Sequence, residues 1–261
     1  MPRTALTREV PESIARCELT YLDRVPIDYA RAAAQHAEYE AALAALGCAV
    51  ERIPPAPDLP DSVFVEDAAV VFDDVAIITR PGAPSRRAET ASVAGVLSRY
   101  RPLLFIEAPG TVDGGDVLRV GRRVFVGLSS RTSLDGAAQL RDLLQPFDYA
   151  VETVRVGGCL HLKSAATALA SDLLLVNPDF VDVAHFGGLR LLDVHPEEPF
   201  AANVLAIDAV VLCAASAPRT AQTLETNGFQ AAAVDMSELA KAEAGLTCCS
   251  LIIEVQREGS L

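Results

Sequence analysis

The sequence predicts an α/β protein in which five similar units close into a propeller-like ring. Short hairpin patterns begin near residues 68, 116, 165, 204 and 250, and their spacings of about 39–49 residues are typical of repeat architectures. After four of these patterns, apolar residues recur at helical spacing and a further β-rich segment follows, so that each unit reads ββαβ. An open α/β fold with irregular hairpins is the alternative, because hairpins and helices alternate in many folds.

Four of the units lie in one continuous stretch. Ser85 follows a Pro-Gly-Ala-Pro turn and is the expected N-cap of the first helix, whereas Gly228 is expected to end the fourth, because glycine adopts the left-handed cap freely. The expected segments are a hairpin at 68–80, a helix at 85–100 and a strand at 103–107; a hairpin at 116–127, a helix at 131–145 and a strand at 149–156; a hairpin at 165–176, a helix at 179–185 and a strand at 189–194; and a hairpin at 204–213, a helix at 217–227 and a strand at 229–235.

The fifth unit is divided between the two ends of the sequence. A C-terminal strand is expected at 250–255 and its partner near 14–21, followed by a helix at 28–46 and a strand at 48–53. Joining both ends in one sheet closes the ring and removes exposed sheet edges. No linker or change of composition divides the sequence, so residues 1–261 are expected to form a single domain.

The composition limits the classes of function. The chain is 51% hydrophobic and 22% charged, which is typical of a folded protein with a large core. Its net charge of −13 argues against nucleic-acid binding and favours a cationic small molecule as the partner. No apolar run approaches the roughly 20 residues that a membrane span needs. The N-terminus has no signal pattern and the six cysteines form no C-x-x-C pair, so we expect a cytoplasmic protein with reduced thiols, either monomeric or homodimeric.

A polar or reactive group stands just before each hairpin pattern. If the five units close around an axis, these groups converge, and a thiol, an imidazole and several carboxylates share one pocket. The groups are Glu66 and Asp67, Asp113, His161, Asn203, and the pair Cys248 and Cys249.

Three of these residues suit nucleophilic catalysis. Cys248 lies at a loop–strand junction, where a thiol activated by a cation or a hydrogen-bond donor can attack. His161 follows a Gly-Gly pair and is the candidate acid and base, which Asp113 would orient, while Asp116 would cap backbone groups. The structural alternatives are a buried thiol, a core histidine and a turn aspartate.

Charged residues around the same segments suggest the ligand. Asp61, Glu66 and Asp67 suit a guanidinium or an amine, although strand alternation would turn Glu66 and Asp67 to opposite sides. Arg86 and Arg131 each begin a predicted helix, where a basic side chain opposes the helix dipole; they could bind a substrate carboxylate or be solvated surface residues. The sequence has no P-loop, nucleophile elbow, dinucleotide fingerprint or metal-ligand constellation, so no cofactor and no metal are expected.

Several motifs resemble the dimethylarginine dimethylaminohydrolases, which belong to the pentein superfamily of guanidino-group-modifying enzymes. The resemblance covers nearly the whole chain and is strongest from Pro60 to Ser164. It implies a five-bladed α/β propeller with pseudo-fivefold symmetry, closed by the N- and C-terminal strands. The motifs are LPDSVFVEDAAVVFDDVAIITRPGAPSRR, DGGDVLRVGRRVFVGLSSRT, LHLKS, MSELAK and LTCCS.

The resemblance also implies an activity, the hydrolysis of Nω-methylated arginine to citrulline and dimethylamine or methylamine, without a cofactor. The implied catalytic residues are the nucleophile Cys248, the acid and base His161, and its carboxylate partner Asp113. A zinc ion could bind Cys248 as an inhibitor. The implied ligand-binding residues are Asp61, Glu66, Asp67, Arg86, Arg131 and, on a mobile lid, Leu19.

Two segments depart from the family pattern and leave the substrate open. The lid sequence ESIARCELTY is little matched, and AEAGLTCC replaces DGLLTCC before the nucleophile. The alternatives are the same chemistry on arginine, hydroxyarginine or a biosynthetic guanidine, transfer of the amidino group to an amine, and a non-enzymatic binding role.

Overall fold

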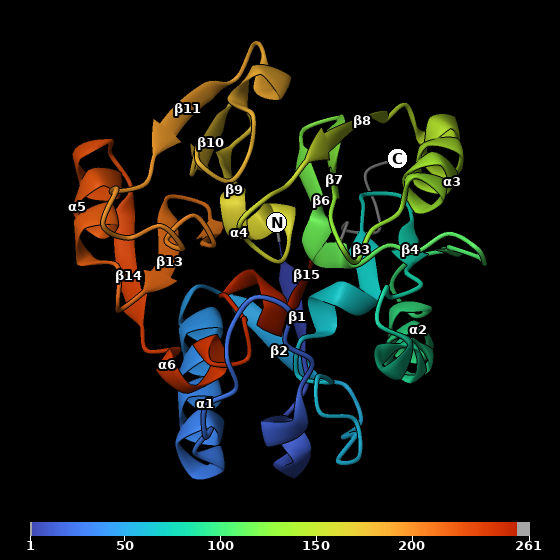
Figure 1. Ribbon diagram of the computed structural model, residues 1–261, viewed down its shortest axis with the longest axis horizontal. Helices are drawn as coiled ribbons and strands as arrows, with labels where there is room; N and C mark the ends of the chain where they lie inside the picture. Colours follow the sequence, from blue (N-terminus) through green and yellow to red (C-terminus); the bar gives the residue numbers. More distant parts are fainter. Residues whose placement is uncertain (1, 255–261) are drawn as a thin grey trace.

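The computed structural model describes residues 2–254 and contains five three-stranded sheets around a common centre (Figure 1). In each sheet, an antiparallel pair of strands is extended by a third strand that runs parallel to the middle one. The predicted five-bladed α/β propeller is therefore confirmed. Helices α1, α2, α3 and α5 lie toward the outside of the ring, and α4 lies near its centre (Figure 1).

The four blades in the continuous stretch follow the predicted order. Gly228 ends the fourth-blade helix as expected, with a φ of 90°. The strands and α-helices are β3 (Ala69–Val71), β4 (Ala76–Ile78), α2 (Thr90–Leu97) and β5 (Leu103–Phe105); β6 (Val117–Val120), β7 (Arg123–Leu128), α3 (Leu134–Leu144) and β8 (Ala150–Arg155); β9 (Ala166–Ala170), β10 (Leu173–Val176) and β11 (Arg190–Asp193); and β12 (Leu205–Ile207), β13 (Val210–Ala214), α5 (Pro218–Thr226) and β14 (Gln230–Val234).

Two local predictions in these blades are wrong. The helix expected at 179–185 is only a 3-10 turn, η6 (Val183–Phe186), because a pair of glycines follows it and leaves too few residues for further helical turns. Ser85 does not cap a helix, since it lies inside another 3-10 turn, η3 (Pro84–Glu89). Its hydroxyl donates to the carboxylate of Glu18 instead.

The fifth blade joins the two ends of the chain. Its strands are β15 (Leu251–Glu254), β1 (Arg3–Thr7) and β2 (Cys48–Arg52), with β1 in the middle. Helix α1 (Tyr29–Ala45) connects the parallel pair β1 and β2. The register places Arg3 opposite Glu254. The predicted closure by terminal strands is therefore correct.

The strand expected at 14–21 is wrong, because β1 takes its place. Ala5 and Leu6 are both fully buried, so β1 is covered on both faces and lacks the alternation that marks a half-exposed strand. The apolar residues near 14–21 pack from a 3-10 turn, η1 (Glu12–Arg16), that begins after Pro11.

Short helical turns at the starts of the blades meet at the centre of the ring. Turn η2 (Val65–Ala68) contacts both η4 (Gly114–Asp116) and η7 (Thr247–Cys249), and η4 contacts α4 (Leu162–Ala165). These are the segments that carry or adjoin the polar residues expected to converge. The ring therefore brings residues from distant parts of the sequence to one place.

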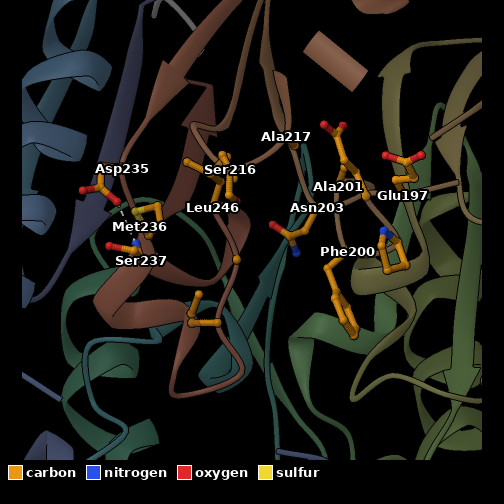
Figure 2. Close-up of a pocket in the computed structure, with 16 residues that line it drawn as sticks. Glu197, Phe200, Ala201, Asn203, Ser216, Ala217, Asp235, Met236, Ser237 and Leu246 are labelled. Carbon is orange, nitrogen blue, oxygen red and sulfur yellow. Dashed lines mark hydrogen bonds between the residues drawn. The ribbon is translucent and has the colours of Figure 1, made fainter. Parts of the chain in front are cut away.

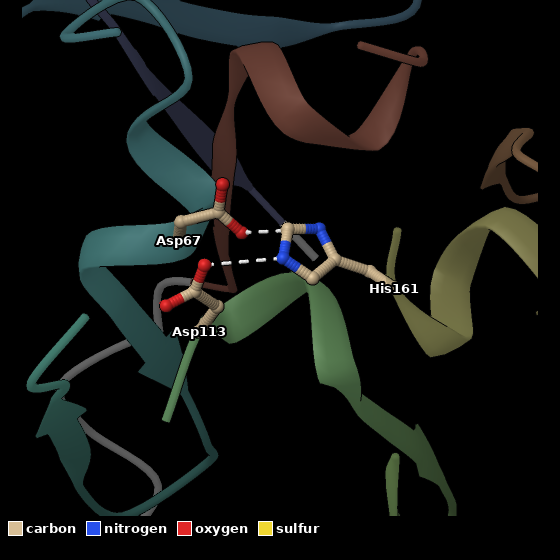
Figure 3. Close-up of side chains that lie close together, drawn as sticks. All are labelled: Asp67, Asp113 and His161. Carbon is tan, nitrogen blue, oxygen red and sulfur yellow. Dashed lines mark hydrogen bonds and ion pairs between the residues drawn. The ribbon is translucent and has the colours of Figure 1, made fainter. Parts of the chain in front are cut away.

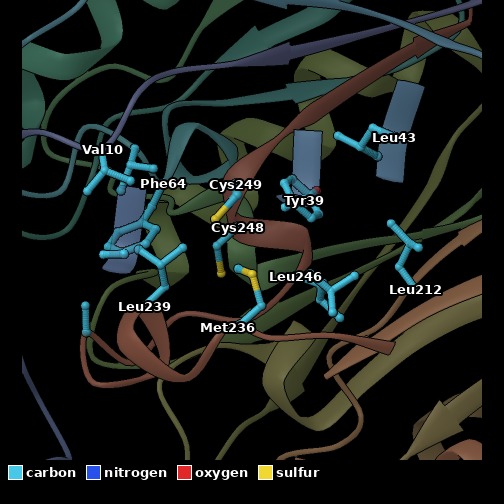
Figure 4. Close-up of a cluster of buried hydrophobic side chains, with 14 of the residues drawn as sticks. Val10, Tyr39, Leu43, Phe64, Leu212, Met236, Leu239, Leu246, Cys248 and Cys249 are labelled. Carbon is cyan, nitrogen blue, oxygen red and sulfur yellow. The ribbon is translucent and has the colours of Figure 1, made fainter. Parts of the chain in front are cut away.

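An apolar cluster between α1, α6 (Ser237–Ala240) and η7 supports the central turns. Tyr39 and Leu43 of α1 and Leu239 of α6 belong to this cluster, which extends to both cysteines of η7 (Figure 4). The remaining helical element within residues 2–254 is the 3-10 turn η5 (Gln145–Phe147). Within residues 2–254, no helix combines the length and the apolar composition needed to cross a membrane.

Candidate active site

The turn η7 presents one of its two cysteines to a cavity. Cys248 lines this cavity, and the backbone N–H of Gly245 donates to its Sγ at 3.3 Å. Cys249 is fully buried in the apolar cluster of α1 (Figure 4). Burial raises the pKa of both thiols, and the nearby carboxylate of Glu66 raises it further. Cys248 is therefore a neutral thiol at physiological pH in the ligand-free protein.

His161 lines the base of the cavity, and its imidazole faces the carboxylates of Asp67 and Asp113 (Figure 3). Its Nε2 is 3.1 Å from Asp113 Oδ2, and its Nδ1 is 3.8 Å from Asp67 Oδ1. Burial alone would lower the pKa of His161, but Asp67, Asp113 and Asp116 outweigh that effect and raise it to about 9. The imidazole is therefore protonated at neutral pH, and its Nε2–H donates to Asp113.

Asp116 and Gly115 hold this imidazole in place. Asp116 accepts hydrogen bonds from the Leu162 N–H at 2.9 Å and the Ser129 hydroxyl at 2.6 Å, and burial raises its pKa to about 6. The bond to Leu162 fixes the start of α4, directly after His161. A side chain at Gly115 would meet His161 Nδ1 at 2.6 Å, so only glycine allows this approach.

Glu66 and Asp67 are both buried in η2, and each has different partners. Glu66 accepts from Lys163 Nζ and from the Thr247 hydroxyl, both at 2.6 Å. Asp67 accepts from Arg86 Nη1 at 2.6 Å and from the Gly115 N–H at 2.9 Å. Burial would raise the pKa of Asp67, but His161 and Arg86 lower it to about 2. A 3-10 turn, not strand alternation, separates the two carboxylates.

Arg86 and Arg131 also line the cavity, and only 3% and 8% of their surfaces are exposed. The alternative that both arginines are solvated surface residues is therefore wrong. Arg86 pairs with Asp67 and with Glu89 Oε2 at 2.9 Å. Arg131 Nη2 donates to the Thr20 hydroxyl at 3.0 Å, whereas no described residue accepts a hydrogen bond from its buried Nη1. That nitrogen is 3.9 Å from Asp113 Oδ2.

A segment at 18–22, hereafter the lid, closes the cavity. The Glu18 N–H donates to Asp61 at 3.1 Å, and burial raises the pKa of Asp61. Glu243 accepts from the backbone N–H groups of Thr20, Tyr21 and Leu22 at 2.5–3.1 Å. Leu19 is half-buried against the apolar cluster of α1.

The closed cavity has a volume of about 20 Å³, close to that of one water molecule. In this conformation the cavity is too small for an amino acid. Within the described chain, Glu66, Asp113 and Leu19 do not line the cavity, whereas six of the predicted site residues do. These are Asp61, Asp67, Arg86, Arg131, His161 and Cys248.

Asp67, Asp113 and His161 each offer one ligand atom within 4.8 Å of the others, a spacing at which a metal ion could bind. Protein donors already compensate both carboxylates, because Asp67 accepts from Arg86 and Asp113 accepts from the Gly82 N–H at 2.8 Å. The arrangement suits a charged imidazole better than a metal ion.

Several residues of the site escaped the sequence analysis. Lys163 and Thr247 lie inside the quoted motifs LHLKS and LTCCS, but nothing in the spacing identified them as partners of Glu66. Glu243 was noted only as part of a segment that departs from the family pattern. Asn203 stood at the repeated polar position without a role, and that position was the available signal.

Comparisons with known proteins show similar sequences and similar folds. No family model matches the chain. It is 42% identical over 250 residues to an N(G),N(G)-dimethylarginine dimethylaminohydrolase of Streptomyces coelicolor, covering 95% of this chain and 96% of the relative. It is 38% identical over 226 residues to the Pseudomonas aeruginosa enzyme of the same name, covering 86% and 89%.

Solved structures resemble the fold equally closely. A cysteine-to-serine variant of the Pseudomonas aeruginosa enzyme, complexed with citrulline, matches with a TM-score of 0.92 and 35% identity over 97% of this chain and 100% of that one. A histidine-to-glycine dimethylarginine dimethylaminohydrolase forms an adduct with S-methyl-L-thiocitrulline, and it matches with a TM-score of 0.91, 34% identity and the same coverage. The N-terminal domain of ArgZ, a cyanobacterial arginine dihydrolase, has the same fold at 18% identity and a TM-score of 0.87, over 97% of this chain and 98% of that domain.

Proposed function

The chain belongs to the dimethylarginine dimethylaminohydrolase family, and on this premise we propose that it hydrolyses Nω-methylated arginine. The substrates are asymmetric dimethylarginine or monomethylarginine, and the products are citrulline and dimethylamine or methylamine. Such an enzyme acts on the C–N bond of a linear amidine. The observation that carries the proposal is the closed acidic cavity that Cys248 and His161 line together.

Cys248 is the proposed nucleophile. Its thiolate attacks the central carbon of the substrate guanidinium, and a C–S bond forms. The C–N bond to the methylated nitrogen then breaks, and His161 supplies the proton with which the amine leaves. A covalent S-alkylthiouronium intermediate remains on Cys248. Two moderate steps thereby replace one difficult displacement by water.

His161 completes the cycle in the second step. After giving up its proton it is neutral, so it can take a proton from a water molecule that attacks the same carbon. The C–S bond breaks with its electron pair on the sulfur, the second water proton passes from the new C–O group to that thiolate, and citrulline leaves the neutral thiol of Cys248. Asp113 holds Nε2 of the imidazole, which leaves Nδ1 as the nitrogen that exchanges protons with the substrate.

The charges of the cavity suggest when Cys248 ionises. Burial and the carboxylates of Glu66 and Asp67 raise the pKa of the free thiol. A cationic guanidinium in the cavity, beside Asp67, compensates this negative charge and favours the thiolate. We therefore expect Cys248 to lose its proton only after the substrate arrives, and Asp67 to keep the guanidinium cationic and its carbon electrophilic.

Arg131 suits the carboxylate end of an amino-acid substrate. Its Nη1 is buried without an acceptor among residues 2–254, and leaving a buried donor unpaired costs about 1–3 kcal/mol. A substrate carboxylate would satisfy it. We propose that Arg86 and Asp61 complete this end of the site, with Leu19 contacting the ligand from the lid.

The six cysteines, all described by the structure, are free thiols. This supports the proposal that the enzyme works in a reducing compartment such as the cytoplasm.

Citrulline release from asymmetric dimethylarginine tests the proposal, with arginine in parallel and Cys248→Ser as the control. We expect release from the methylated substrate and none from the variant. Release from arginine alone would replace the proposed substrate by an unmethylated guanidine, and transfer to added glycine or ornithine would replace hydrolysis by amidino transfer. No release from any guanidine would overturn the proposal.

A further inference from the structure

A closed ring of hydrogen bonds lies behind the nucleophile. Asn203 Nδ2 donates to the Thr247 hydroxyl at 3.1 Å, and that hydroxyl donates to Glu66 Oε2 at 2.6 Å. Lys163 Nζ donates to Glu66 Oε1 at 2.6 Å, and Asn203 Nδ2 also donates to the Lys163 carbonyl at 3.1 Å. Lys163 takes part through both its side chain and its carbonyl, and it lies two residues after His161. Thr247, the residue before Cys248, is also part of the ring.

Asn203 has the only amide side chain in this ring, and 8% of its surface is exposed. It lies just before β12 and points into the space between Phe200 and Leu246, where it lines a separate cavity of about 220 Å³ (Figure 2). A side chain at Gly245 would meet Asn203 Cγ at 2.3 Å. The backbone that leads to Cys248 therefore packs directly on this amide.

The hydrogen bonds require an amide in one orientation. Asn203 Oδ1 accepts from the Thr247 N–H at 3.0 Å, while Nδ2 donates to the Lys163 carbonyl and the Thr247 hydroxyl. Exchanging the two amide atoms would set a donor against the Thr247 N–H and an acceptor against a carbonyl. A carboxylate cannot donate, and an aliphatic side chain can do neither.

We propose that Asn203 is a positioning residue for the reaction. It joins the turn that carries Cys248 to the helix that follows His161, and so it fixes the distance and orientation between the sulfur and the imidazole. This inference rests on the proposed function, because it concerns the geometry of the same two groups. Small misplacements of reacting groups can slow an enzyme by about 100-fold.

The test compares Asn203→Leu and Asn203→Asp with the matched control Asn177→Leu. Asn177 is a second buried asparagine, whose Nδ2 donates to the Pro199 carbonyl at 2.8 Å and whose Oδ1 accepts from the Asp179 N–H at 2.9 Å, outside the cavity lining. We expect Asn203→Leu to lower kcat about 10- to 100-fold with KM within about threefold. Asn203→Asp keeps one acceptor, so its kcat should fall less than that of Asn203→Leu.

Hydrogen exchange of the peptide at 245–249 provides a readout that does not depend on turnover. We expect faster exchange there in both Asn203 variants than in Asn177→Leu, when each variant is measured at a temperature at which all are equally stable. If Asn203→Leu does not fold, Asn203→Asp carries the test alone. A kcat within twofold of the unmodified chain per folded molecule, or exchange at 245–249 no faster than in Asn177→Leu, would overturn the inference.

The two proposals fail in different ways. An unmodified chain that releases citrulline from no guanidine would overturn the proposed function, whereas the exchange comparison would still decide whether Asn203 holds the turn. If the unmodified chain is active and the Asn203 variants match Asn177→Leu, only the positioning role is lost.

Discussion

The base of the cavity and its lid are held by different kinds of contact. At the base, side chains from several blades bond to one another, and Asp67, Asp113 and His161 are each at most 4% exposed. The lid is held mainly by its own backbone N–H groups, which donate to Asp61 and Glu243. Two side-chain bonds are added, from Ser85 to Glu18 and from Arg131 to Thr20. Tyr21 and Leu22 of the lid are exposed.

This difference separates the chemistry from the access of the substrate. Buried charge pairs at the base keep reacting groups in position before the substrate arrives, which is how preorganised sites lower a barrier. Bonds from a backbone to two carboxylates can break together and form again without repacking a core. We therefore expect changes at the base to alter kcat and stability, and changes at the lid to alter KM.

The largest effect is expected at the base, from Asp113→Asn. Loss of the charge removes the carboxylate to which the imidazole Nε2–H donates, so kcat should fall about 100- to 10,000-fold. Steady-state kinetics with asymmetric dimethylarginine measure this effect. The control is Asp172→Asn, at an exposed pair with Arg190. Equal activities of the two variants would show that Asp113 has no part in catalysis.

The second effect is a loss of stability at alkaline pH. His161 is buried among Asp67, Asp113 and Asp116, and its pKa of about 9 in the folded state exceeds its ordinary value of 6.5. The folded protein binds this proton more tightly, so its contribution is complete below pH 6.5 and disappears as the pH rises through 9.

The expected contribution of His161 is about 3 kcal/mol, the free energy that corresponds to a rise of its pKa from 6.5 to about 9. Urea unfolding at pH 6.5 and pH 9.5 measures it. In His161→Gln this part of the pH dependence should be absent. A variant that loses as much stability over the same range as the unmodified chain would contradict the assignment.

At the lid, Glu243→Gln should raise KM about 5- to 30-fold while kcat changes less than about threefold. Three N–H groups lose a charged acceptor, and hydrogen bonds to a charged group contribute about 1.5–3 kcal/mol each, of which a neutral amide oxygen restores part. Glu197→Gln, at an exposed pair with Arg219, is the control. A fall in kcat with constant KM would mean that Glu243 acts on the chemistry rather than on access.

The smallest expected effect concerns the thiol itself. Because burial and Glu66 raise the pKa of Cys248, alkylation by chloroacetamide should require strongly alkaline conditions in the free protein. Millimolar guanidinium ion should lower the pH at half-maximal alkylation by about one unit, since it compensates the carboxylates. Mass spectrometry of the Cys248 peptide measures the rate, and an unchanged pH profile would argue against ionisation on substrate arrival.

The sequence predicted the ring well because hairpin spacing and turn residues are local signals. Gly228 ended its helix as expected, and the repeated polar positions came together at the centre. The strand β1 was missed because both of its faces are buried, which hides the alternation of a strand.

The sequence predicted which residues belong to the site better than it predicted the contacts between them. Motifs identified Glu66, but its bonds to Lys163 and Thr247 join segments that lie 97 and 181 residues away along the chain. Hydrophobic periodicity is a local pattern and does not predict contacts between residues so far apart in the sequence. The pairing of Arg86 with both Asp67 and Glu89 depends in the same way on tertiary packing, which also decides that an arginine near a helix start is buried.

The blade that joins β1 to β15 makes the order of the five blades independent of where the chain starts. Arg3 and Glu254 are neighbours in one sheet, so a short linker between these strands would produce a circular polypeptide without displacing a blade. The chain could then be opened at a hairpin tip such as the exposed Arg122, between β6 and β7, in a circular permutant that retains every central turn. Such a permutant would place Asp113 after Cys248 along the chain, instead of ahead of His161, while leaving the spatial relation of the three residues unchanged.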